Sequence, residues 1–139
     1  MSPPDRSRVF DVVRVTITEV LALDEAEVRL EHSLERDLGA ESIDLLDLLF
    51  RFQRTLGVKM RREDIGPMLR GDLAREEFAD ADGKLTDEGV RQLRASLPQI
   101  DVEELRGTLH ASDIFSLITV ENLADLVWRR ICAETSREP

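Results

Sequence analysis

The sequence is short of the residues that build disulfides and metal sites. Its 139 residues include one cysteine, Cys132, and two histidines, His32 and His110, which lie far apart in the chain. A single thiol cannot form an internal disulfide or a cysteine-based zinc site, and histidines so widely spaced form no local metal motif. We therefore expect no disulfide framework and no metal centre, and the cysteine content fits a reducing cytoplasm.

Long apolar runs are missing as well. No stretch reaches the roughly 18 consecutive apolar residues that a membrane-spanning helix needs. The first residues, MSPPDR, contain no apolar segment of the length found in signal peptides. From these absences we expect a cytoplasmic protein with no stable membrane insertion.

The patterns of common catalytic and calcium sites are also absent. The sequence contains no glycine-rich phosphate loop, and its histidines belong to no recognisable Ser/His/Asp constellation. Residues 80–85 resemble part of an EF-hand loop, but placing Gly83 at the loop's glycine position puts Phe78 and Gly89 where carboxylate ligands are required. We expect a turn with a special backbone angle at Gly83, no calcium site and no enzymatic activity.

Positive charge is scarce relative to negative charge, and the imbalance is local. The chain has 19 Lys and Arg against 29 Asp and Glu, a formal net charge of -10. Within residues 24–47 there are nine acidic residues against two arginines. Such a chain is unsuited to bind nucleic acid, whose phosphates repel it, and its partners should be basic.

Hydrophobic periodicity predicts an all-α protein that forms one domain over residues 1–139. Apolar residues recur at helical spacing in residues 5–21, in residues 42–56 and in a last helix that Thr119 caps. A further helix should begin at the N-cap Thr86 and end before Pro98. Shorter turns are expected at 101–107, opened by Asp101 and Glu104 and closed by Gly107, and at 113–117, capped by Ser112; fraying is expected after Glu134.

Residues 22–40 should form a long loop before the second helix. We expect four apolar side chains to fix this loop to the core: Val28, Leu30, Leu34 and Leu38. The loop ends in the segment DLGAESIDL, residues 37–45, which places Ser42 at the start of a helix. There the free backbone N–H groups and the helix dipole stabilise an anion such as a phosphodiester, and Gly39 permits a tight turn.

The segment 37–45 resembles the attachment site of the acyl carrier proteins. The resemblance implies a four-helix bundle in which Ser42 carries covalent 4'-phosphopantetheine, whose thiol holds acyl groups as thioesters. It further implies a monomer that serves fatty acid, lipid or polyketide biosynthesis. The implied partners are a phosphopantetheinyl transferase and an acyl ligase, ketosynthase or acyltransferase with a basic docking surface.

The resemblance also suggests residues for partner binding and for an acyl pocket. The partner-binding residues would be Glu41, Asp44, Leu46, Asp47 and Phe50. The pocket would be lined by Leu45, Leu46, Leu49, Ile114, Phe115 and Ile118. Core packing and a solvated helix face are the simpler explanations for the individual residues in these two sets.

The sequence departs from the family in three ways. Glu41 precedes the serine where aspartate is more usual, and Ile43 follows it where leucine is usual, which should narrow the choice of phosphopantetheinyl transferase. Arg51, Gln53 and Arg54 occupy positions where the family commonly keeps acidic or small residues, so partner recognition should differ. About 50 residues, 61–110, intervene where the family has a short connection, so we expect a helical insertion between helices two and three. Two alternatives remain open from the sequence: an unmodified interaction domain with the same fold, and a carrier of peptidyl or aminoacyl groups.

Overall fold

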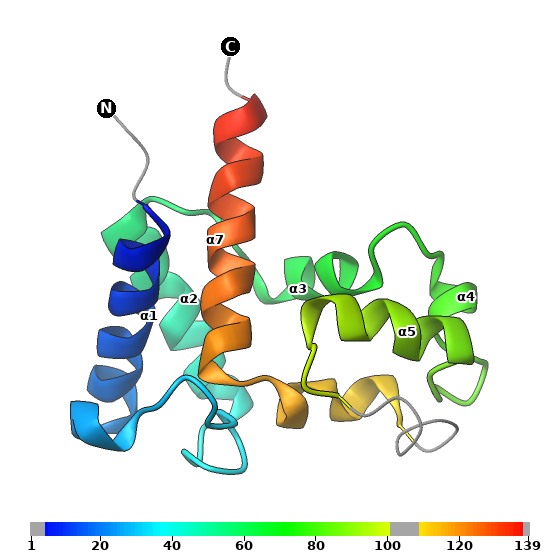
Figure 1. Ribbon diagram of the computed structural model, residues 1–139, viewed down its shortest axis with the longest axis horizontal. Helices are drawn as coiled ribbons and strands as arrows, with labels where there is room; N and C mark the ends of the chain where they lie inside the picture. The colour runs from blue at the N-terminus through cyan, green and yellow to red at the C-terminus, as the bar shows by residue number, and fades with distance from the viewer. Residues whose placement is uncertain (1–4, 101–108, 138–139) are drawn as a thin grey trace.

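An all-α bundle holds the core of the protein (Figure 1). The computed structural model describes residues 5–100 and 109–137. Helices α1 (Arg6–Leu21), α2 (Ser42–Leu56) and α7 (Val120–Arg137) form the bundle, in which α1 contacts both α2 and α7. α1 and α7 run antiparallel, so the start of α1 and the end of α7 lie at the same end of the molecule (Figure 1). The predicted fold class is confirmed.

The predicted apolar stripes form the core of this bundle. Burying one large apolar side chain stabilises the folded state by about 1.5–3 kcal/mol, which is why each helix turns its stripe inward. The buried residues of the stripes are Val9, Val13 and Ile17 in α1, Leu45, Leu48, Leu49 and Phe52 in α2, and Val120, Leu123, Ala124, Leu126, Val127 and Ile131 in α7.

Several helix ends are capped, including the starts predicted at Thr86 and Thr119. The side chains of Asp5, Thr86 and Thr119 each accept a hydrogen bond from the backbone N–H three residues further on, at 2.8, 2.9 and 3.1 Å. Gly57 ends α2 in the left-handed conformation, with φ of 73°, and Gly83 also has a positive φ, 85°. The capping side chains accept hydrogen bonds from backbone N–H groups that the start of a helix leaves free, and the left-handed glycine ends α2.

The segment before α7 differs from the prediction. It forms the 3-10 helix η2 (Ala111–Leu117), which begins one residue before Ser112, the residue expected to precede it as a cap. The position before the first residue of η2 is held by His110 in an extended conformation, so the turn starts earlier than the apolar pattern suggests. The turn predicted at 101–107 lies outside the described residues.

The end of α7 also differs from the prediction, because the helix continues to Arg137 instead of fraying after Glu134. The backbone N–H of Lys59 donates a hydrogen bond to the carboxylate of Glu134, at 3.2 Å. Arg130 donates from Nε to the carbonyl oxygen of Lys59, at 3.1 Å. These contacts fix the last turns of α7 to the chain that leaves α2.

In the described part of the chain, no helix has the length and apolar character needed to cross a membrane.

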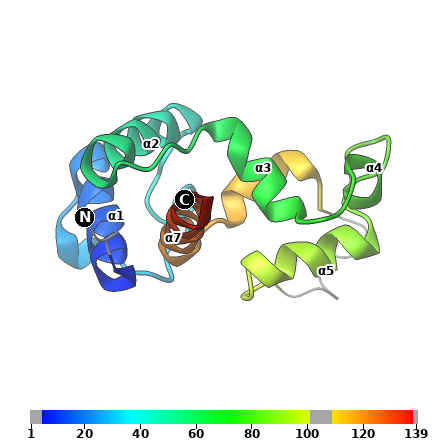
Figure 2. The same cartoon turned by 90° about the horizontal axis from the view of Figure 1, so that it is seen from above.

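The insertion forms a second group of helices to one side of the bundle in both views (Figures 1 and 2). It contains α3 (Arg62–Arg70), α4 (Arg75–Phe78) and α5 (Asp87–Ser96). The expected helix from Thr86 is α5, whereas α3 was not predicted. α3 contains Gly66 and Pro67, which are the two poorest helix formers and therefore hid its helical pattern.

A polar network joins the insertion to the start of α7. Asn122 is buried, with 5% of its surface exposed. Its Oδ1 accepts a hydrogen bond from Gln99 Nε2, at 2.7 Å, and its Nδ2 donates to the carbonyl oxygen of Ser96, at 3.4 Å. Arg129 donates from Nη1 to the hydroxyl of Ser96, at 2.9 Å. The end of α5 is thereby held against the bundle.

Candidate functional site

Ser42 is the first residue of α2 and is exposed, where the sequence predicted it. Glu41 precedes it with an extended backbone, and the Glu41 N–H donates to a carboxylate oxygen of Asp44, at 2.8 Å. Within the described part of the chain, the Ser42 hydroxyl makes no hydrogen bond. It therefore lies free to react at a helix N-terminus, where backbone N–H groups and the helix dipole favour a negative charge.

The loop before α2 is fastened to η2 and to the start of α7. The N–H of Leu34 donates to the carbonyl oxygen of Ile118, at 3.0 Å, and the N–H of Val120 donates to that of His32, at 2.9 Å. The hydroxyl of Ser33 donates to the carbonyl oxygen of Ser116, at 2.9 Å. These bonds place the segment that leads to Ser42 against residues more than 80 positions away.

Two of the four expected loop anchors are fully buried. Val28 and Leu34 are 0% exposed. Leu38 is half-buried and packs at the edge of the core. Leu30 is 37% exposed, so its expected role as an anchor is wrong. Its backbone fixes the loop instead, because its carbonyl oxygen accepts the N–H of Glu121 at 2.9 Å.

A pocket of about 330 Å³, which we name the Ser42 pocket, lies between the start of α2, α3 and η2. Its lining is Glu35, Ser42, Leu45, Arg62, Ile65, Gly66, Leu69, Ile114, Phe115 and Ile118. The structure thus brings four of the six residues predicted for an acyl pocket together with Ser42. Leu46 and Leu49 lie outside the lining, because Leu46 points to solvent, 50% exposed, and Leu49 is buried in the core, 4% exposed.

The sequence analysis missed the contribution of α3 to this pocket. Arg62, Ile65, Gly66 and Leu69 follow one another at steps of three, one and three residues, which is the spacing of a single helix face. Ile65 and Leu69 are 7% and 3% exposed. The apolar pair at i, i+4 was the one signal for this face, and the glycine and proline between its members obscured it.

A second hollow also borders Ser42 and has a volume of about 590 Å³. It is lined by Glu35, Gly39, Ala40, Glu41, Ser42, Ile43 and Phe115. Gly39 has a φ of 73°, and a Cβ built there would meet nothing within 4 Å. Ser42 therefore borders two open hollows, which leave room for a bulky group such as phosphopantetheine on its hydroxyl.

The acidic residues predicted for partner binding are partly engaged within the chain. Asp44 is half-buried and accepts the Glu41 N–H. Asp47 accepts a hydrogen bond from Arg51 Nε, at 3.0 Å. Glu41 is exposed. The negative charge on the exposed face of α2 is thus smaller than the sequence suggests, because Arg51 pairs with Asp47, the acidic residue of this set furthest from Ser42.

The exposed face of α2 is instead marked by apolar side chains. Ile43, Leu46 and Phe50 are 68%, 50% and 59% exposed, and we name them the α2 apolar strip. Their spacing of three and four residues puts them on one side of the helix. Leu46 and Phe50 were predicted for partner binding, whereas Ile43 was missed. The Arg54 guanidinium lies over the Phe50 ring, 5.9 Å from its centroid, at the far end of the strip.

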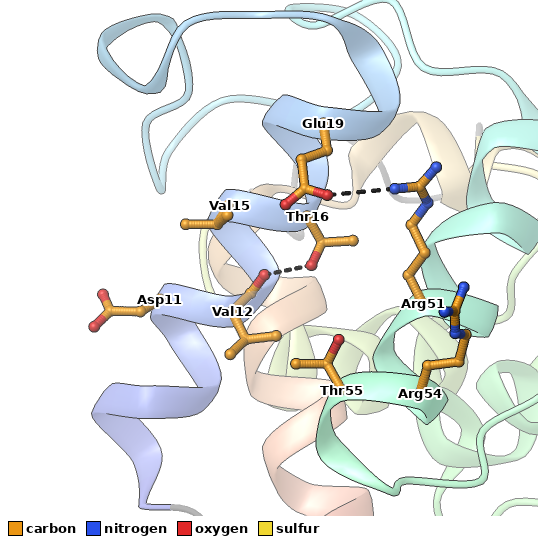
Figure 3. Close-up of a pocket in the computed structure, with 8 residues that line it drawn as sticks. All are labelled: Asp11, Val12, Val15, Thr16, Glu19, Arg51, Arg54 and Thr55. Atoms are coloured by element: carbon orange, nitrogen blue, oxygen red, sulfur yellow. Dashed lines mark hydrogen bonds and ion pairs between the residues drawn. The ribbon is translucent and has the colours of Figure 1, made fainter.

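A groove of about 580 Å³ between α1 and α2 does not include Ser42 (Figure 3). Arg51 crosses it from α2 and forms an ion pair with Glu19 of α1, at 3.4 Å. Thr16 turns back to its own helix, where its hydroxyl donates to the carbonyl oxygen of Val12, at 2.6 Å. Both side chains of the ion pair are exposed, so the pair connects the two helices at the surface. Among the described residues, no cluster of side chains could hold a metal ion.

Comparison with known proteins identifies the region that contains Ser42. Residues 11–66 match the family model described as a phosphopantetheine attachment site. The match contains all of α2 and ends within α3, so it extends into the segment 61–110 that was expected to be an insertion.

Several curated proteins match the chain over a similar length. The acyl carrier protein of Thermotoga maritima is 42% identical over 60 residues, which cover 43% of this chain and 74% of that protein. The acyl carrier protein of Petrotoga mobilis is 35% identical over 60 residues, covering 43% of this chain and 71% of the relative. That of Helicobacter acinonychis is 34% identical over 55 residues, covering 40% and 70%.

Proposed function

This chain belongs to the acyl carrier protein family and acts as an acyl carrier with covalent 4'-phosphopantetheine, and we propose that Ser42 is the residue that bears this arm. The observation that carries the proposal is the exposed hydroxyl at the first position of α2, inside the matched region and between two hollows. The arm supplies a thiol that holds acyl groups as thioesters. A separate transferase attaches the arm, and the chain's own residues accept it, orient it and present it.

The junction before α2 favours attachment at Ser42 for electrostatic reasons. A phosphodiester on the serine oxygen would lie beside the free N–H groups of the first turn of α2 and at the positive end of its dipole. The hydrogen bonds from the preceding loop to η2 hold the serine in this place. A flexible arm on a fixed point keeps its cargo at high effective concentration for enzymes that dock nearby.

We propose that the Ser42 pocket receives the acyl chain of the cargo. Leu45, Ile114, Phe115 and Ile118 supply apolar surface, and Ser42 itself belongs to the lining, so the pocket begins where the arm is attached. Each methylene that enters the pocket gains about 0.8 kcal/mol from leaving water. Short chains gain less than long ones, so the pocket shelters the longer cargo.

We propose that partner enzymes dock on α2 beside Ser42. The α2 apolar strip offers exposed apolar area, and Glu41, Asp44 and Asp47 add negative charge toward the serine. A transferase that attaches the arm and the ligase, ketosynthase or acyltransferase that handles the cargo would meet these residues with apolar and basic side chains. The pathway would be fatty acid, lipid or polyketide biosynthesis in the cytoplasm, with the chain itself a monomer that catalyses no reaction.

Intact mass spectrometry tests the attachment. The protein is co-expressed with a broad-specificity phosphopantetheinyl transferase, together with Ser42→Ala and, as a matched control, Ser116→Ala. We expect the added mass of phosphopantetheine on the wild type and on Ser116→Ala, and none on Ser42→Ala. An unmodified wild type would favour the alternative of an interaction domain without an arm, and modification of Ser42→Ala would place the arm elsewhere.

A loading experiment separates acyl from peptidyl carriage. The modified protein is incubated with an acyl ligase and fatty acids, or with an adenylation enzyme and amino acids. We expect a thioester with the fatty acid. Exclusive loading with amino acids would support the peptidyl or aminoacyl carrier.

A further inference from the structure

Arg62 occupies an unusual place beside Ser42. It is the first residue of α3 and begins the helix face that lines the Ser42 pocket. Its side chain is exposed, and no ion pair involves it within the described residues. The neighbouring Arg61 differs, because its side chain is 78% exposed, lies outside the pocket lining and pairs with Asp64 at 3.8 Å.

The surroundings of Ser42 are otherwise acidic. Of the described residues that line the two hollows beside the serine, Glu35 and Glu41 carry negative charge and Arg62 alone carries positive charge. A phosphodiester attached to Ser42 would add a further negative charge that the two glutamates repel. Arg62 supplies a cation in the lining of the same pocket.

We propose that Arg62 binds the phosphodiester on Ser42 and thereby directs the arm into the Ser42 pocket. This inference rests on the proposed attachment at Ser42. A guanidinium donates parallel hydrogen bonds to phosphate oxygens and stays charged at every physiological pH, so it suits this role better than a lysine. The charged residues that line the second hollow are Glu35 and Glu41, so the phosphodiester meets a cation only on the α3 side. Arg62 is thus a positioning residue for the arm.

Phosphorus-31 NMR of the modified full-length protein tests the contact. We compare the wild type with Arg62→Gln, Arg62→Lys and the matched control Arg61→Gln. We expect the phosphodiester resonance to move in Arg62→Gln, to move less in Arg62→Lys and to stay in place in Arg61→Gln. In the wild type, raising the salt concentration from about 0.05 to 0.5 M should move the resonance toward its position in Arg62→Gln, because salt screens an exposed pair.

A second measurement tests the direction of the arm. The protein is loaded with an octanoyl group, and cleavage of the thioester by hydroxylamine is followed by mass spectrometry. We expect cleavage in Arg62→Gln to be about two- to fivefold faster than in the wild type, as loss of an exposed ion pair allows, and unchanged in Arg61→Gln. The result reports exposure of the thioester and does not depend on any partner enzyme.

The outcomes separate the two proposals. If no arm forms on Ser42, the proposed function fails. If the arm forms but Arg62→Gln leaves the resonance and the cleavage rate unchanged, or if Arg61→Gln changes them equally, the role of Arg62 is overturned while attachment at Ser42 stands.

Discussion

The hydroxyl of Ser33 donates a hydrogen bond of 2.9 Å to the carbonyl oxygen of Ser116. The bond connects the loop before α2 with η2 across 83 positions of sequence. Ser33 is 9% exposed, and its hydroxyl also accepts the N–H of Arg36, at 3.1 Å. The Ser33 side chain therefore stabilises the turn of the loop and also connects the loop to η2, which forms part of the wall of the Ser42 pocket.

Ser33→Ala should lower the free energy of unfolding by about 1 kcal/mol, the net contribution of a hydrogen bond in a protein. Urea denaturation followed by circular dichroism measures the change. Ser116→Ala is the comparison, because it keeps the carbonyl that accepts the bond from Ser33 and loses only an exposed bond from its own hydroxyl to the Asp113 carbonyl oxygen, at 2.7 Å, so it should cost less. A Ser33→Ala variant as stable as the wild type would contradict this role of Ser33.

Asn122→Ala should destabilise the protein by about 1–3 kcal/mol, since it leaves buried backbone groups without partners. Asn122 Oδ1 accepts from Thr119 N–H, at 3.0 Å, as well as from Gln99, at 2.7 Å. Amide hydrogen exchange in α5 should accelerate as well, because the network that fastens the end of this helix to α7 is lost. Gln99→Ala keeps the bond to Thr119 and should have the smaller effect. Unchanged exchange in α5 would contradict this role of the network.

Gly89→Ala should destabilise α5 because there is no room for a Cβ. A Cβ built at Gly89 would overlap the carbonyl oxygen of Phe78. Although alanine favours a helix by up to about 1 kcal/mol over glycine, overpacking against backbone typically costs 1–3 kcal/mol, so we expect a net loss. Thermal unfolding measures it, and Glu88→Ala on the exposed side of the same helix is the control. A variant as stable as the wild type would mean that α4 and α5 separate readily.

Phe50→Asp should leave stability almost unchanged and weaken the docking of partners. Phe50 is 59% exposed, so its replacement should alter the free energy of unfolding by no more than about 0.5 kcal/mol. If the α2 apolar strip meets the transferase, kcat/KM for modification should fall about tenfold, as for the loss of a central apolar contact. Val15→Asp changes an exposed valine of α1 and should leave kcat/KM intact. Equal rates for wild type and Phe50→Asp would exclude the strip from this interface.

The helices that have both an apolar stripe and a cap can be predicted from the sequence alone. α1 combines the Asp5 cap with its stripe, α5 begins at Thr86, and α2 begins at Ser42 and ends at Gly57. Such local signals act within a few residues and can be read directly.

The helix that was not predicted depends on contacts between distant segments of the chain. α3 carries Gly66 and Pro67, which argue against a helix, and it forms because Ile65 and Leu69 are buried by residues far away in the chain. The pairing of Asp47 with Arg51 differs, because it is a local contact between residues four apart in α2, and a count of charges overlooks it. Charge counted along a chain does not reveal which side chains neutralise one another.

The antiparallel course of α1 and α7 has a practical consequence for single-molecule and surface experiments. Ile118, which precedes α7, lines the same pocket as Ser42, whereas the other end of this 18-residue helix is about 27 Å away. The start of α1 lies at that remote end too (Figure 1). Attaching the protein to a sensor chip through the start of α1 or the end of α7 would therefore keep the proposed arm on Ser42 away from the chip surface.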